Sequence, residues 1–129
     1  MSCETILVVE DDEEIRKSVV RALKSEGYNV LVAENGRIAL EVLAKLSPEE
    51  LPGCMILDLM MPEMDGKTLI KTIDRDHKDK YGNIKILIAT AKGSPVSPDA
   101  IPQSVERIQK PFDLEELFRV VELHCGKPS

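Results

Sequence analysis

Short apolar runs alternate along this chain with longer stretches in which apolar residues recur every three or four positions. Runs of this kind that are closed by polar or turn-forming residues are typical of strands covered on both faces of a sheet. The third run starts at Met55, carries Asp58 toward its end and stops at Met61-Pro62. The other runs predict four more strands, at residues 5–9, 29–34, 83–90 and 105–109.

The stretches between the runs have the periodicity of helices with one buried face. One helix is predicted from Asp12 to a stop at Gly27, and another from Asn35-Gly36 to a stop at Ser47-Pro48. Asp65 is a candidate N-cap for a third, and Asp113 for the last. The predicted buried faces are Ile15, Val19, Ala22 and Leu23; Ala39, Leu40, Leu43 and Leu46; Leu69, Ile70 and Ile73; and Leu114, Leu117, Phe118, Val121 and Cys125.

Strand and helix alternate about five times, which predicts an α/β fold with a doubly wound, five-stranded parallel sheet. Its crossovers are expected to be right-handed, with helices on both faces. The length of 129 residues fits one domain, 1–129, with no room for a second. Because all strands point the same way, their carboxyl ends meet at one edge, where open α/β sheets hold their ligands.

Polar residues gather at the predicted carboxyl ends of four strands. They are the pair Glu10 and Asp11, then Asp58, Thr90 and Lys110. Taken alone, Asp58 could simply cap a turn after a strand. The convergence of four strand ends on one edge argues against that interpretation and predicts a site there.

Three carboxylates crowded at one edge repel one another unless some are protonated or a divalent cation lies among them. Oxygen ligands favour a hard ion such as Mg²⁺. Asp11 and Asp58 are the candidate direct ligands, and Glu10 is expected to act through a metal-bound water. The acidic run from Glu10 to Glu14 could instead stabilise a helix N-terminus, a role that we expect for Glu13 and Glu14.

Lys110 and Thr90 add a positive charge and a hydroxyl that suit a phosphoryl group. An ionised aspartate beside Mg²⁺ can attack phosphorus to give an acyl phosphate, and hydrolysis by an in-line water reverses the step. Considered singly, Lys110 would more often be a surface lysine and Thr90 a strand-end hydroxyl.

Composition excludes several other classes of function. The net charge of -6 and the pI near 5.0 argue against direct binding to nucleic acid, which needs a basic face. No apolar run is long enough to span a membrane, and the N-terminus lacks a signal pattern, so a cytoplasmic location is expected. Neither His77 nor His124 completes a zinc pattern with a cysteine, and reduced thiols are expected at Cys3, Cys54 and Cys125.

Four motifs, V-V-E-D-D, I-L-D-L-M-M-P-E-M-D-G, I-A-T-A and Q-K-P-F, occur in this order and cover nearly the whole chain. Together they resemble the receiver domain of two-component response regulators. The resemblance implies a flavodoxin-like strand order of 2-1-3-4-5. It also implies Mg²⁺-dependent phosphorylation by a sensor histidine kinase or a histidine phosphotransfer protein, which switches interaction with a downstream partner.

The same resemblance implies a role for each motif residue. Asp58 would be the phosphoacceptor, Thr90 the switch hydroxyl and Lys110 a cation that pairs with the phosphoryl oxygens, with the Ala91 amide as a further donor. The metal ligands would be Glu10, Asp11, Asp58 and the backbone carbonyl of Met60. The bond before Pro111 is expected to be cis, as is frequent in the family.

Two departures from the family pattern concern output. Arg107 stands where receivers usually carry an aromatic residue, three positions before the lysine. The segment 91–109 contains Pro95, Pro98 and Pro102, so a weakened or missing fourth helix is expected. We therefore expect no dimerisation through the usual fourth-helix face, and a response to phosphorylation that mainly reorders residues 92–104.

Two rival functions stay open at this point. A pseudo-receiver could keep the fold as a docking module without being phosphorylated, although the intact acceptor, acids, threonine and lysine count against it. A phosphatase that works through an aspartyl phosphate would carry a second aspartate two residues after the nucleophile, where this chain has Met60. A phosphoacceptor that is not a conventional turnover enzyme fits the residues best.

Overall fold

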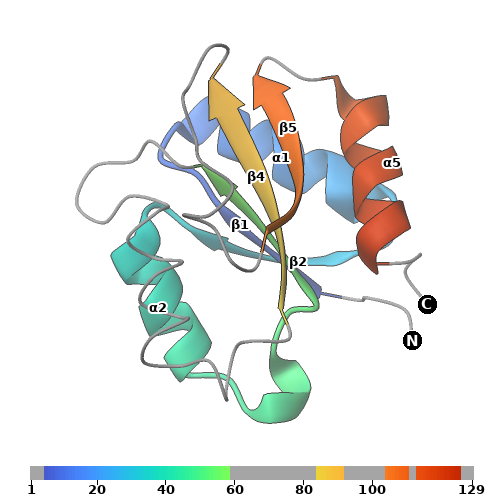
Figure 1. The fold of residues 1–129 in the computed structure, drawn as a ribbon. Helices are drawn as coiled ribbons and strands as arrows, with labels where there is room; N and C mark the ends of the chain where they lie inside the picture. The colour runs from blue at the N-terminus through green and yellow to red at the C-terminus, as the bar shows by residue number, and fades with distance from the viewer. Residues whose placement is uncertain (1–4, 59–83, 92–103, 111–112, 126–129) are drawn as a thin grey trace.

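In a computed structural model of the chain, the structure describes residues 5–58, 84–91, 104–110 and 113–125. The parallel α/β architecture that the sequence predicts is confirmed (Figure 1). Its elements in chain order are β1 (Thr5–Val9), α1 (Glu13–Ser25), β2 (Asn29–Ala33), α2 (Gly36–Ala44), the 3-10 turn η1 (Pro48–Glu50), β3 (Cys54–Asp58), β4 (Lys85–Ala91), β5 (Ser104–Lys110) and α5 (Leu114–Cys125).

The five strands form one sheet in the order β2-β1-β3-β4-β5, and every neighbouring pair is parallel. This is the order that the family resemblance implied. The ladder between β4 and β5 shifts register after Ile86, which pairs with Ser104, because Leu87 already pairs with Glu106. Such a shift marks a β-bulge or a comparable irregularity, at which one strand carries an extra residue.

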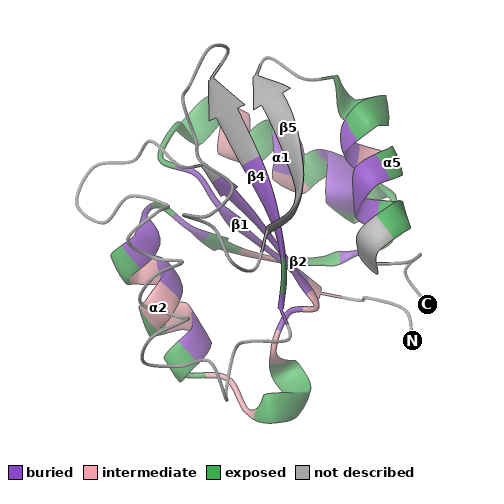
Figure 2. Ribbon diagram, in the orientation of Figure 1, coloured by how far each residue is buried: buried purple, intermediate pink, exposed green. Residues whose placement is uncertain are grey.

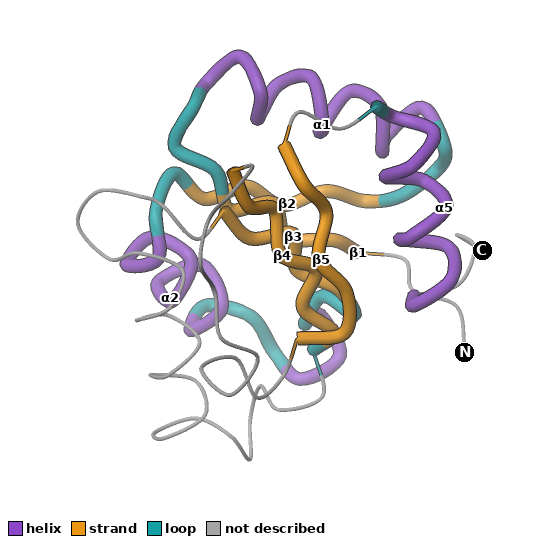
Figure 3. Tube along the Cα trace, turned by 45° about the horizontal axis from the view of Figure 1, so that its top comes forward, coloured by secondary structure: helices purple, strands orange, loops and turns teal. Residues whose placement is uncertain are grey.

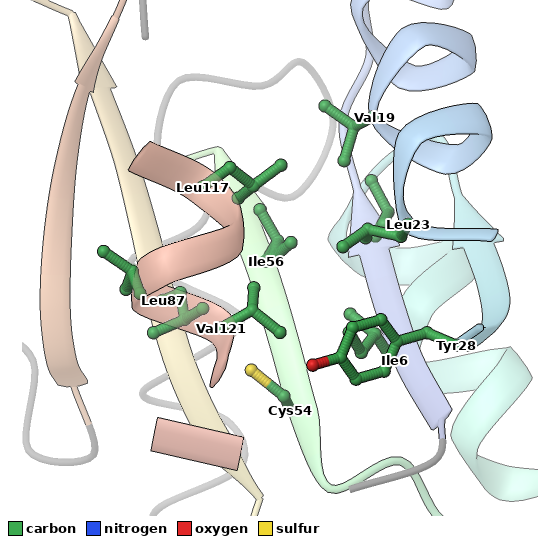
Figure 4. Close-up of a cluster of buried hydrophobic side chains, with 11 residues drawn as sticks. Ile6, Val19, Leu23, Tyr28, Cys54, Ile56, Leu87, Leu117 and Val121 are labelled. Carbon is green, nitrogen blue, oxygen red and sulfur yellow. The ribbon is translucent and has the colours of Figure 1, made fainter. Parts of the chain in front are cut away.

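One face of the sheet is covered by α1 and α5, as Figure 3 shows. Val19 and Leu23 from α1, and Leu117 and Val121 from α5, pack against alternate strand residues such as Ile56. Tyr28 closes this cluster, and its ring points toward Cys54, which is a buried free thiol (Figure 4). A reduced thiol at Cys54 is what the sequence predicted.

The opposite face is covered by α2, whose Ala39 and Leu43 are fully buried. They pack against the other strand residues, namely Leu7, Val9, Met55, Leu57, Ile86 and Ile88. The central strands are therefore buried on both faces, and exposed residues lie on the outer sides of the helices (Figure 2). This two-sided burial explains why the strands appear in the sequence as continuous apolar runs.

Side chains that accept backbone hydrogen bonds fix the beginnings of the helices. Asp12 Oδ1 accepts from the Ile15 N–H at 3.0 Å, and Asn35 Oδ1 accepts from the Ile38 N–H at 2.9 Å. Asp113 Oδ1 accepts from the Glu116 N–H at 2.8 Å, so the cap predicted at Asp113 is present. Gly27, after the end of α1, has φ 100°, a left-handed conformation that costs glycine least.

Two expectations about the helices are corrected. Leu114 was predicted to be buried, but it is 41% exposed, whereas Val120 is 1% exposed. The buried stripe of α5 is centred on Leu117, Val120 and Val121, so Leu114 lies on its flank in the first turn. The second helix ends at Ala44 and not at Ser47-Pro48, where the separate turn η1 begins.

Other predicted features lie outside the described residues. They are the helix that follows Asp65, the fourth helix or its absence, and the bond before Pro111. Within the ranges that the structure describes, no helix is both long and apolar enough to cross a membrane.

Candidate functional site

The predicted site residues lie at one edge of the sheet as far as their backbones are described. Asp58 is the last residue of β3, Lys110 is the last residue of β5, and Thr90 comes one residue before the end of β4. Glu10 and Asp11 follow β1 directly. Because these strands are parallel neighbours, all four carboxyl ends meet at the same edge, toward which the strand arrows point in Figure 1.

The strand register shows how closely these positions approach one another. Val9 pairs with Leu57, so Glu10 and Asp58 follow equivalent positions on adjacent strands. Asp58 pairs with Ala89, which places the Thr90 backbone one residue farther along β4. Ala91 in turn pairs with Lys110. The backbone thus brings an acid pair, an aspartate, a threonine and a lysine onto four consecutive strands.

Glu10 is an acid held inside the edge. Its relative exposure is 5%, and its Oε2 accepts from the Asp12 N–H at 3.4 Å. Its backbone is also fixed, because its N–H donates to the Ala33 carbonyl at 3.1 Å. A buried carboxylate held beside the N-terminus of α1 lies where partial positive charge favours an anion.

Asp11 differs from Glu10 because its side chain is exposed. The next two acids serve α1: Asp12 is its N-cap, and Glu13 Oε1 lies 2.9 Å from Lys17 Nζ. The hydrogen bond from Lys17, followed by its positive charge, lowers the pKa of the fully exposed Glu13. The acidic run therefore divides into Glu10 and Asp11 at the edge and acids that stabilise the helix.

Arg16 is a residue of this edge that the sequence did not single out. Its Nη1 donates to the Glu10 carbonyl oxygen at 2.9 Å, which ties the turn carrying the acid pair to the first turns of α1. A spacing of six residues between an acid and an arginine matches no known sequence motif. The contact therefore becomes visible only in the folded turn. Arg16 thus helps to position the backbone of Glu10.

The side chains of Asp58, Thr90, Ala91 and Lys110 lie outside the described part of the structure, and Met60 lies outside it entirely. Among the side chains that are described, no three carboxylate, histidine or cysteine groups gather as metal ligands do. Glu10 and Asp11 are the acids of this edge whose side chains are described. The strand register places the backbone of Asp58 next to them.

A family model described as the response regulator receiver domain matches residues 6–122. The chain is 34% identical over 120 residues to the sensor kinase CckA of Brucella abortus. The aligned region covers 92% of this chain and 12% of that protein. The chain is also 34% identical over 121 residues to the response regulator MprA of Mycolicibacterium vanbaalenii, which covers 88% of this chain and 46% of that one. The chain thus spans less than half the length of either relative.

Solved structures agree with this match. A CheY-like receiver domain protein from Methanospirillum hungatei superposes with a TM-score of 0.82 at 29% identity, covering 95% of this chain and 94% of the other. The chemotaxis response regulator CheY4 of Vibrio cholerae gives 0.80 at 27% identity, covering 95% and 98%. The family model matches most of the chain, and the strand order agrees with it. This chain therefore belongs to the receiver domain family of two-component response regulators.

Proposed function

We propose that this receiver takes a phosphoryl group from a phosphohistidine donor onto the carboxylate of Asp58. Phosphorylation-based signalling is the general function of the family to which the chain belongs. The observation that carries the assignment is the strand register, which lines up the backbones of Asp58, Thr90 and Lys110 beside the acids that follow β1.

The reaction exchanges one bond to phosphorus for another. An Asp58 carboxylate oxygen attacks the phosphorus in line, the bond from phosphorus to the imidazole nitrogen breaks, and that nitrogen keeps the electron pair. Hydrolysis of the acyl phosphate by water then restores the carboxylate and releases inorganic phosphate. The protein is thus an acceptor that is consumed and regenerated, unlike a conventional turnover enzyme.

The neighbouring strand ends supply the groups that hold the transferred phosphoryl group. In this proposal the Lys110 ammonium neutralises charge on its oxygens, and the Thr90 hydroxyl and the Ala91 N–H donate hydrogen bonds to them. Ala91 pairs with Lys110 in the β4-β5 ladder, which supports placing the Lys110 ammonium and the Ala91 N–H around the same phosphoryl group.

The donor set also fits Mg²⁺, because it consists of oxygens alone. Asp11, Asp58 and the Met60 carbonyl would hold the ion directly, and the buried Glu10 would act through a bound water. When bound, Mg²⁺ offsets the negative charge of the acids and of the phosphoryl oxygens. The exposure of Asp11 beside the buried Glu10 supports this division of roles.

Sequence relatives include both a sensor kinase and a response regulator. We therefore propose a sensor histidine kinase or a histidine phosphotransfer protein as the donor, and a downstream partner whose binding changes with phosphorylation. A cytoplasmic location is part of the same proposal, because such donors present their phosphohistidine there.

Incubation with acetyl phosphate and Mg²⁺, followed by intact-protein mass spectrometry, tests the proposal. We expect one phosphoryl group on the wild-type protein and none on Asp58→Asn, which keeps the shape but removes the nucleophile. Lys110→Ala should retain part of the labelling. A wild-type protein that gains no phosphate would instead be a docking module, and continuous release of phosphate without an adduct would point to a phosphatase.

A further inference from the structure

A groove lies along the side of α1 that faces β2, and it shares Arg16 with the predicted phosphoacceptor edge. Its volume is about 500 Å³, within the range of roughly 300–1,000 Å³ that is usual for ligand sites. Figure 3 shows α1 running over β2, the edge strand of the sheet. The groove is lined by five residues of α1 and one of β2, namely Arg16, Lys17, Val20, Arg21, Lys24 and Val32.

The groove is basic although the protein is acidic. Among the residues that the structure describes, four lysines and arginines and no acid line it, against a net charge of -6 for the whole chain. Lys17 is paired with Glu13, and Arg16 donates to the Glu10 carbonyl. Within the described ranges, Arg21 and Lys24 take part in no ion pair. Two neighbouring cations that the described part of the chain leaves unpaired attract an anionic partner.

The floor of the groove is apolar. Val32 is 47% exposed, whereas its partner in the β1-β2 ladder, Val8, is only 1% exposed. Val30, two residues earlier on the same side of β2, packs in the cluster below α1 together with Val20. The cover provided by α1 therefore stops short of Val32, and a partner side chain could complete it.

We propose that this groove binds an acidic segment of a partner protein, with carboxylates along the cations of α1 and an apolar side chain on Val20 and Val32. From Arg16 to Lys24 the helix rises about 12 Å, which matches about four residues of extended peptide. Because β2 is an edge strand, an extended segment can lie alongside it. The described lining of the groove contains no aromatic side chain for a nucleobase to stack on, which favours a peptide over RNA or DNA.

The groove shares Arg16 with the predicted phosphoacceptor edge, but Arg21, Lys24 and Val32 contact none of the predicted site residues that the structure describes, so the test does not require phosphorylation. A fluorescent nonapeptide of glutamates and aspartates with one central valine serves as the probe, and its analogue with glutamine and asparagine is the neutral control. Binding is followed by anisotropy at low and high salt, and by backbone NMR shifts of the labelled protein. We expect shifts at Val20, Lys24 and Val32, and weaker binding at high salt.

Charge reversal distinguishes binding at the groove from general electrostatic attraction to the protein. The double variant Arg21→Glu, Lys24→Glu should lose at least about tenfold in affinity for the acidic peptide. The matched control Lys85→Glu, Arg119→Glu changes the net charge equally at exposed sites elsewhere, and should stay within about twofold. If the reversed variant does not fold, Arg21→Gln, Lys24→Gln should still weaken binding by several-fold.

Three results would overturn the proposal. One is the absence of shifts at the groove with the peptide at millimolar concentration and low salt. Another is an equal loss of affinity in the control variant, or equal binding of the neutral peptide. The third is tighter binding of a single-stranded oligonucleotide than of the acidic peptide, with the same sensitivity to Arg21 and Lys24, which would assign the groove to phosphate polymers.

Discussion

The middle of the sheet and its carboxyl edge are built from the same strands but have opposite surroundings. Leu7 and Leu57 are fully buried, each packed against apolar side chains of neighbouring strands and of α2. One to four residues farther along the chain, Glu10 is buried as an acid, Asp11 is exposed, and β3 ends at Asp58.

We infer from this contrast that stability and the proposed chemistry are separated by position along each strand. The middle contributes apolar burial, which scales with the area removed from water. The edge gathers acids whose mutual repulsion opposes folding, and the proposed Mg²⁺ and phosphoryl group depend on those acids. Substitutions in the two regions should therefore have different effects: loss of stability in one, and loss of metal binding and phosphorylation in the other.

The largest effect on stability is expected from Leu7→Ala in the middle of β1. The side chain is 0% exposed, and its removal leaves a cavity between β1 and α2. Urea denaturation should report a loss of about 2–5 kcal/mol in the free energy of unfolding. Val32→Ala, at a position that is 47% exposed in the neighbouring strand, serves as the control and should cost at most about 1 kcal/mol. Equal losses in the two variants would refute the contrast in burial.

Magnesium should act only at the edge. At a concentration about 100 times its dissociation constant, Mg²⁺ should raise the free energy of unfolding by about 2.7 kcal/mol, because it binds the folded protein alone. Thermal or urea denaturation with and without the ion measures this shift, with Ca²⁺-free buffers and Asp11→Ala as the control. A wild-type protein that millimolar Mg²⁺ does not stabilise, or an Asp11→Ala variant that gains as much, would contradict the proposed ligands.

Removal of a helix cap should have a smaller effect. Asp12→Ala deletes the oxygen that accepts the Ile15 N–H at 3.0 Å, at a cost of about 1 kcal/mol. Asp113→Ala, which removes the corresponding cap of α5, should cost a similar amount far along the chain from the acid pair. Asp12→Ser keeps a capping oxygen and should recover most of the loss. If Asp12→Ser were as unstable as Asp12→Ala, the capping role would be wrong.

The alternation of apolar runs and periodic stretches was sufficient to predict the strands, because burial on both faces leaves continuous apolar sequence. The cap at Asp113 and the helix beginnings at Asp12 and Asn35 were also predictable, since capping is a local interaction. Leu114 was misplaced because periodicity alone does not say which side of a wide apolar stripe faces the sheet. That choice depends on how α5 lies against β4 and β5, which is a tertiary property.

The edge was predictable for the same topological reason, as parallel strands must bring their carboxyl ends together. The contact from Arg16 to the Glu10 carbonyl was not, because it depends on the conformation of the turn between them. The basic groove was also not predicted from the sequence. Its cations read in the sequence as the solvated side of a helix, and only the placement of β2 adds Val32 to them.

The smallest effect is expected at η1, remote in sequence from the acid pair. The Ser47 N–H donates to Glu50 Oε1 at 2.9 Å, and this hydrogen bond, followed by one from the Ser47 side chain, lowers the pKa of Glu50 below its ordinary value of 4.5. A lowered pKa in the folded state stabilises the protein above the unfolded value, and the contribution is lost as the pH falls through the folded value.

Glu50→Gln should therefore be slightly less stable than the wild type above pH 4.5, with a difference that shrinks on further acidification. Urea denaturation over a pH series measures it, and Glu49→Gln, outside this hydrogen bond, is the control. A difference that grows toward acid would have the wrong sign.

The most direct test of the central claim is to locate the acyl phosphate on the chain. After phosphorylation with acetyl phosphate and Mg²⁺, borohydride reduces an aspartyl phosphate to homoserine, which peptide mass spectrometry can place. We predict homoserine at position 58 in the wild-type protein and at no other aspartate, and none in Asp58→Asn. Homoserine at Asp11 or another position, or a phosphorylated wild-type protein with Asp58 unchanged, would contradict the assignment of Asp58 as the acceptor.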